Sequence, residues 1–265
     1  HALLTSLGVI RVAGADAVSF LQSQLTQNIA GQAVDRMALA GYCNPKGRLL
    51  ALMQCIRRED HCLLVTDRSL VAGLVKRLRM YVLRSRVQLE DISERMPVIG
   101  VAGAALAAGP EPALSPGSVA ERTEGLALAR AHGTGQWWLY TDPDAATRAG
   151  ERLLARAPAV DEAVWRLLDI RDGLPWVCSA TSEAFVPQQV NLDLVEGVSF
   201  RKGCYPGQEV VARMHYLGKP SRRMIRLRAN GPVAGLPDPG TELQTADGDV
   251  AGRVVSAARG AAVEL

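Results

Sequence analysis

Hydrophobic residues in the first hundred positions recur at two spacings, which together predict a sheet with helices packed against it. Alternating or continuous apolar runs predict strands at 7–12, 49–56, 62–66, 87–92 and 97–101. The charged segment 57–61 joins two of these strands as a hairpin. Apolar residues three and four positions apart predict short helices after Asp16 and after Asp67, each of which is a suitable N-cap.

The second half of the chain alternates between regular and irregular stretches. Strands are predicted at 126–131 and 137–141, and helices after Asp142-Pro143 and over 160–170. The segment 175–205 is irregular yet rich in amides and aromatic residues, which indicates an ordered functional segment. Beyond residue 218, short apolar runs at 224–227, 242–244 and 252–255 between prolines and glycines predict a small β module.

This order of elements is neither a strict β-α alternation nor all-β, so it predicts an α+β fold. We expect two parts: an α+β body over residues 1–216 and a small β unit over 217–265. The chain of 265 residues with 48% hydrophobic residues can bury an ample core, which excludes wholesale disorder.

Charge and cysteine content narrow the function classes. A net charge of +3 is too small to indicate nucleic-acid binding by itself. The longest apolar run, 98–109, is too short to span a membrane, so no membrane association is expected. Five cysteines, an odd number without a C-x-x-C pair, favour a reducing cytoplasm over a disulfide framework. With only four histidines, no metal site is expected.

The most unusual segment is 201–209, Arg-Lys-Gly-Cys-Tyr-Pro-Gly-Gln-Glu. A helix predicted directly after it places Cys204 close to a helix N-terminus, with Arg201 and Lys202 beside it. Both the helix dipole and the two cations favour a thiolate over a thiol. The segment therefore predicts a reactive cysteine on a shaped turn, although a free cysteine is also commonly a small buried hydrophobe. The other four cysteines lie mostly in or beside apolar runs and are expected to be structural.

Two other groups of polar residues are weaker candidates. Amides that can match the donor–acceptor edge of a heterocycle occur as Gln22, Gln24 and Asn28 and as Gln188, Gln189 and Asn191. Basic residues at 76–86 and 222–228 are consistent with a phosphate-binding surface, and equally with the solvated faces of a helix and a strand. No alternating aromatic–basic pattern accompanies them.

At this point a family resemblance becomes specific. The segment 202–209 resembles the K-G-C-[FY]-x-G-Q-E signature of the YgfZ folate-binding family, a relative of the glycine cleavage aminomethyltransferase (T-protein). The segments 20–26, 43–48, 171–175 and 185–192 resemble further motifs of that family in the same order. The residues of the signature are Lys202, Gly203, Cys204, Tyr205, Gly207, Gln208 and Glu209.

The resemblance implies three subdomains in a ring around a central hole, the last a small C-terminal β-barrel, with tetrahydrofolate held in the hole. It also implies a role in assembling or repairing iron–sulfur proteins, including enzymes that modify tRNA, with Cys204 as the functional thiol. The partners would be folate and iron–sulfur enzymes or assembly proteins. The cofactor-binding residues it implies are Gln22, Gln24, Asn28, Arg171, Gln188, Gln189 and Asn191.

Two departures from the family pattern keep alternatives open. The resemblance implies a carboxylate where this chain has Asn28, and an amide cannot take up a proton as a carboxylate does. Aminomethyl transfer is therefore disfavoured, and whether the chain is an enzyme stays open. The C-terminal unit is short, so either its barrel lacks a strand or the chain has been cut short. The alternative functions are a folate-dependent one-carbon transferase and a module that binds tRNA or a partner protein directly.

Overall fold

The computed structural model describes residues 1–103, 114–122, 124–130, 135–155, 158–218, 220–231, 235–260 and 263–264. Its first layer is a five-stranded antiparallel sheet in the order β3-β4-β5-β2-β6. The strands are β2 (Leu7–Ala13), β3 (Arg36–Cys43), β4 (Leu49–Arg57), β5 (His61–Asp67) and β6 (Gln88–Asp91). The predicted hairpin β4–β5 lies at the centre of this sheet, and the strands predicted at 7–12 and 87–92 form β2 and β6, whereas β3 was not predicted.

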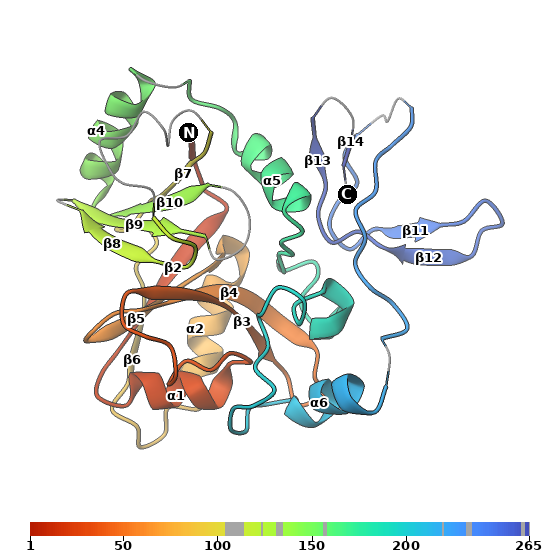
Figure 1. Cartoon of the computed structure of the whole chain (residues 1–265), viewed down its shortest axis with the longest axis horizontal. Coiled ribbons are helices and arrows are strands. Elements are labelled where there is room, and N and C mark those ends of the chain that lie inside the picture. The colour runs from red at the N-terminus through yellow and green to blue at the C-terminus, as the bar shows by residue number, and fades with distance from the viewer. Residues whose placement is uncertain are drawn as a thin grey trace.

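Two helices, α1 (Ala17–Gln24) and α2 (Val71–Arg79), pack on one face of this sheet (Figure 1). Their predicted apolar positions face the strands, as Phe20 and Leu74 do. Asp67 caps the short 3-10 turn Arg68–Leu70 that leads into α2, by accepting a 3.0 Å hydrogen bond from the Ser69 amide. Asp16 is the N-cap residue of α1 as predicted, but its carboxylate accepts from the Arg86 amide at 2.8 Å and makes no capping hydrogen bond to the helix.

The opposite face of the first sheet packs against a second antiparallel sheet, in the order β1-β7-β10-β9-β8. Its strands are β1 (Ala2–Leu3), β7 (Val98–Val101), β8 (Val119–Arg122), β9 (Gly125–Ala129) and β10 (Gln136–Tyr140). Buried Val65 and Ile56 of one sheet meet Trp137 and Leu139 of the other. The N-terminal strand β1 completes the second sheet, so the two layers are intertwined in sequence (Figure 1).

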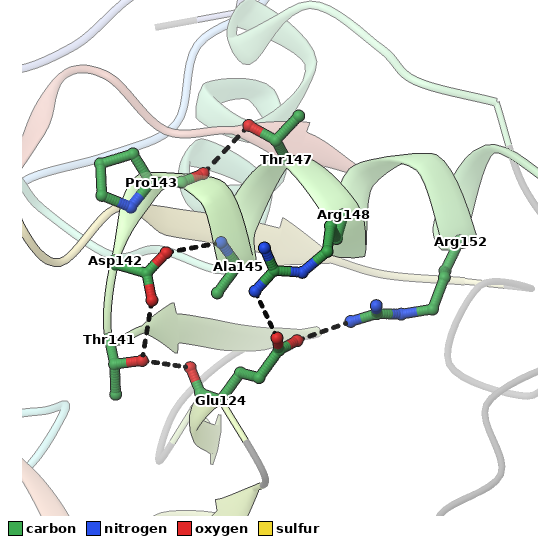
Figure 2. Close-up of polar contacts among 8 residues, drawn as sticks. All are labelled: Glu124, Thr141, Asp142, Pro143, Ala145, Thr147, Arg148 and Arg152. Carbon is green, nitrogen blue, oxygen red and sulfur yellow. Dashed lines mark hydrogen bonds and ion pairs between the residues drawn. The ribbon is translucent and has the colours of Figure 1, made fainter.

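Helices α4 (Pro143–Leu154) and α5 (Glu162–Arg171) accompany the second sheet. Asp142 caps α4 as predicted, accepting a 2.7 Å hydrogen bond from the Ala145 amide, with Pro143 in the first turn (Figure 2). On the same helix, Arg148 and Arg152 both bind the Glu124 carboxylate (Figure 2).

From residue 172 the chain runs along the first sheet, through the 3-10 turn Pro187–Val190, to α6 (Gln208–Tyr216) (Figure 1). The last part forms two short hairpins, β11 (Glu242–Gln244) with β12 (Val250–Arg253) and β13 (Ala258–Arg259) with β14 (Val263–Glu264). The strand predicted at 224–227 is wrong, because these residues pair with no strand among the described residues, where Arg228 bridges to Glu264.

The described residues thus combine helices with two antiparallel sheets, which confirms the predicted α+β class. Within the described ranges, none of the helices has the length and apolar character needed to cross a bilayer.

Candidate functional site

Exposure separates the five cysteines. Cys43, Cys55 and Cys62 are buried, Cys178 is partly buried, and Cys204 is exposed. Burial raises the pKa of the Cys43 thiol to about 12, so that thiol stays protonated at neutral pH. Nucleophilic cysteine chemistry requires an accessible sulfur. Among the five thiols, Cys204 is therefore the one that a partner molecule can reach directly.

Lys202 fastens the cysteine turn to the end of α1. Its ammonium group donates to the carbonyl oxygens of Gln22 and Leu25, at the C-terminal end of that helix, where carbonyls lack partners within the helix. The same ammonium lies 5.0 Å from the centroid of the Tyr205 ring. Burial lowers the pKa of Lys202 to about 8, partly offset by the negative charge that a Cys204 thiolate would carry.

Two glycines lock the other side of the turn. Gly207, the N-cap of α6, has φ +80°, and a Cβ there would lie 2.4 Å from the carbonyl oxygen of Asn44. Gly47 has φ +74°, and a Cβ on it would lie 2.8 Å from Cβ of Val210. The family-like turns 43–48 and 202–209 therefore pack against each other through backbone contacts that only glycine permits.

Cys204 lies three residues before this N-cap. The dipole of α6 acts mainly within the first turn of the helix, so it contributes less to this thiol than the sequence prediction assumed. The predicted cationic neighbour Lys202 is present, because its ammonium group and the Cys204 sulfur interact electrostatically. Glu209 and Arg213, a candidate helical pair, form no ion pair in the described part of the chain.

A cleft of about 810 Å³ opens between the body and the C-terminal hairpins. One wall is formed by Arg48, the segment 183–185 and the amides Gln189 and Asn191, and the other by residues 221–227, β11 and β12. This volume is within the range typical of sites for drug-sized ligands. Because Arg48 ends the turn that packs on Gly207, one segment borders both the cleft and the cysteine turn.

The structure divides the predicted amides into two groups. Gln189 and Asn191 line the cleft, whereas Gln188 is buried beneath it and donates at 2.7 Å to the Val211 carbonyl of α6. Asn191 adopts φ +58°, and its Nδ2 donates to the Met224 carbonyl across the cleft at 2.9 Å. Its Oδ1 is buried without a hydrogen-bond partner, so it can accept from a ligand.

The second group lies at the end of α1, beside Lys202. Gln22 donates to Asn28 Oδ1 at 3.1 Å and accepts from the Ala30 amide at 3.0 Å, so both side chains are engaged in holding the loop after the helix. Gln24 is buried, and its Oε1 has no partner. These three residues adjoin the cysteine turn and do not line the cleft.

Among the described contacts, Arg171 takes part in an ion pair. Its guanidinium binds the Glu264 carboxylate, with an Nη2–Oε1 distance of 2.8 Å, and so ties α5 to β14. The arginine side chains that do line the cleft include Arg48 and Arg222, and Arg222 belongs to the predicted basic segment 222–228. Arg48 belongs to the family-like segment 43–48, which was the available signal for it.

Much of the predicted basic surface is already paired. Arg86 binds Asp16, and Arg79 donates to the Leu89 carbonyl at 2.7 Å. Arg223 forms a two-pronged ion pair with Asp193, at 2.6 and 2.8 Å. Over the residues that the structure describes, no cluster of three or more histidine, cysteine or acidic side chains could hold a metal ion.

Comparison with known proteins defines the class first. Residues 4–108 match the family model described as the GCVT N-terminal domain. The glycine cleavage system aminomethyltransferase T from Bartonella henselae superposes with a TM-score of 0.79 at 18% identity, covering 99% of this chain and 76% of that one. The fold is therefore that of the aminomethyltransferases, here carrying an exposed cysteine on a glycine-locked turn.

The curated relatives then identify the family. The tRNA-modifying protein YgfZ of Edwardsiella ictaluri (strain 93-146) is 34% identical over 247 residues, which cover 91% of this chain and 73% of that protein. The tRNA-modifying protein YgfZ of Vibrio vulnificus (strain CMCP6) is 32% identical over 256 residues, 93% of this chain and 75% of that protein. This chain belongs to the YgfZ family.

Proposed function

We propose that this chain is a cytoplasmic tetrahydrofolate-binding accessory protein that supports iron–sulfur enzymes, including enzymes that modify tRNA, with Cys204 as its functional thiol. The observation that carries the proposal is the position of the signature cysteine. It is the exposed thiol of the five, and its turn packs on the segment that borders the large cleft. The names of the relatives support a role in tRNA modification.

The chemistry of the cleft fits a folate. A pterin ring carries a row of N–H donors and nitrogen or oxygen acceptors, and the unpaired Asn191 Oδ1 is an acceptor suited to it. Gln189 and Arg48 supply further polar groups along the same wall, and exposed Arg222 can attract the carboxylates of a glutamate tail. Bound tetrahydrofolate would supply one-carbon chemistry. The residues of the chain bind and orient it between the two proposed parts, 1–216 and 217–265.

Calorimetric titration with tetrahydrofolate under anaerobic, reducing conditions tests the cofactor proposal. We expect saturable one-to-one binding by the wild-type chain. Asn191→Gly keeps the left-handed backbone but removes the amide, and should weaken binding about tenfold, the value of one well-made polar contact. Asn230→Gly, the same change outside the cleft lining, should bind like wild type. Absence of binding by a well-folded chain contradicts the proposal.

The thiol proposal has a separate test in cells that lack the natural protein. Cys204→Ser should fold normally, because the side chain is exposed, and should fail to restore the activity of iron–sulfur enzymes that modify tRNA. Cys178→Ser is the matched control, because it changes a partly buried cysteine outside the signature. Full complementation by Cys204→Ser would remove the assignment of the functional thiol.

A further inference from the structure

An exposed aromatic cluster lies on the same segment as Cys204. The rings of Phe200 and His215 stack with centroids 3.6 Å apart and an interplanar angle of 13°. Tyr216 meets both of them edge-on, with centroid distances of 6.1 and 4.7 Å. Phe200 is partly buried against the core beneath, which fixes the cluster, whereas the Tyr216 residue is 64% exposed. Aromatic side chains of this size are costly to leave in water, so a held, exposed cluster indicates a contact surface.

Three exposed cations lie on the segments that carry this cluster and on the neighbouring turn. Arg201 precedes Cys204, and Arg213 lies in the last turn of α6 beside His215 and Tyr216. Lys46 lies in the turn that packs on Gly207. All three cations are exposed, and none has a carboxylate partner within the described ranges. The two arginines of α4 differ, since both bind the Glu124 carboxylate (Figure 2).

The aromatic cluster and the cations are close to the thiol. Phe200 and Cys204 are four positions apart in sequence, so their Cα atoms are at most about 14 Å apart. This distance is similar to the span of two or three nucleotides along a single strand. Aromatic rings flanked by unpaired arginine and lysine are the combination that binds unpaired bases by stacking and their phosphates by charge.

We infer that the surface formed by Phe200, His215, Tyr216, Arg201, Arg213 and Lys46 binds an unpaired segment of RNA. An acidic protein would also satisfy the cations, but the stacked rings favour a ligand with flat π-faces next to each negative charge. The inference deepens the proposed function, since it names the partner that this face presents to the Cys204 turn, and its RNA contact is independent of folate.

Fluorescence anisotropy with a labelled RNA hairpin that has an unpaired loop tests the inference, with the blunt stem duplex as the comparison. Wild type should prefer the hairpin. Tyr216→Ala should weaken hairpin binding at least fivefold at every salt concentration, through the loss of stacking. Arg201→Gln combined with Arg213→Gln should weaken binding about tenfold and reduce the slope of log affinity against log salt by about 1.4, because two phosphate contacts are lost.

The control removes the same two charges from the other end of the molecule. Arg148→Gln with Arg152→Gln on α4 should leave RNA binding unchanged (Figures 1 and 2). The inference would be overturned if both double variants lost RNA affinity equally, if Tyr216→Ala bound the hairpin as tightly as wild type, or if wild type did not prefer the hairpin. Failure of wild type to bind RNA would also overturn it. Tetrahydrofolate titration of the same samples separates this failure from failure of the folate proposal, because each ligand has its own readout.

Discussion

At the scale of single residues, burial distinguishes one cysteine from the other four. Iodoacetamide should modify Cys204 in the native chain while Cys43, Cys55 and Cys62 react only after unfolding, because those three sulfurs are buried. Mass spectrometry of partly labelled protein measures the site and rate. Cys204→Ser should remove the fast phase of labelling, and a fast phase that persists in this variant would contradict the assigned exposure.

Lys202 gives a residue-scale prediction about pH. Burial lowers the pKa of this ammonium to about 8, below its usual value near 10.5, so the folded chain releases the proton before the unfolded chain does. Between these two values the unfolded state binds more protons, and the stability contributed by Lys202 rises with pH. The charged form carries a desolvation cost below pH 8. Because the group is only partly buried, we expect a change of about 1 kcal/mol.

The measurement is the difference in unfolding free energy between wild type and Lys202→Met at two pH values, one on each side of this window. The unfolding free energy of wild type should rise relative to that of the variant as pH rises. All other titrating groups are the same in both proteins, so their contributions to the unfolding free energy cancel in the difference. A difference that stays constant, or that falls with pH, would mean that the ammonium is better solvated than its position beneath Tyr205 indicates.

At the scale of elements, the two packed turns determine where α6 begins. Gly207→Ala places a Cβ 2.4 Å from the Asn44 carbonyl oxygen at a left-handed φ, and should cost about 2–4 kcal/mol of stability. Gly203→Ala is the control within the same signature, because nothing lies within 4 Å of its Cβ, and its cost should stay below about 0.5 kcal/mol. Urea unfolding of both variants measures the contrast, and equal stabilities would show that the turns do not depend on this contact.

Elements with a clear local pattern were predictable from sequence, and others were not. The hairpin β4–β5 has two continuous apolar runs on either side of a charged turn, and the helices α2 and α4 have apolar periodicity with a capping aspartate shortly before them. Strand β3 was missed because three of its eight residues are alanine or glycine, which are uncommon in strands. The apolar run at 224–227 lacks a neighbouring strand to pair with, and the local pattern alone could not reveal that.

At the scale of the whole molecule, the candidate site was predictable only in part. The signature turn could be located because its glycines and lysine have local reasons to be there. The amides could not be assigned, since their partners come from distant segments: Gln188 binds α6, whereas Asn191 faces the cleft. Arg171, predicted as a ligand-binding residue, pairs with a carboxylate 93 positions away. Such long-range pairing depends on the assembled fold.

That ion pair also gives a prediction for the molecule as a whole. Arg171 and Glu264 hold α5 against the last hairpin, where Leu167 and Ile170 contact Ala258. Arg171→Ala should therefore loosen the C-terminal part and speed protease cleavage within 217–231, with little change in the unfolding of the body, because a pair whose arginine is half exposed is worth about 1 kcal/mol. Arg148→Ala, which breaks an ion pair on α4 with a similarly exposed arginine, should leave that cleavage unchanged (Figure 2).

The same cleavage rate should also depend on pH and on bound ligand, which gives two further tests of this prediction. Arg171 lowers the pKa of the Glu264 carboxyl, so the pair stabilises the fold fully above the usual pKa of a glutamate, and this stabilisation is lost as pH falls through the lowered value. The difference in cleavage rate between wild type and Arg171→Ala should accordingly shrink in acid. Tetrahydrofolate bound between the body and the hairpins should slow cleavage in both proteins, because the ligand would contact both walls of the cleft. If saturating folate leaves the cleavage rate unchanged, the folate site lies elsewhere, and the amides beside Lys202 are the next candidates.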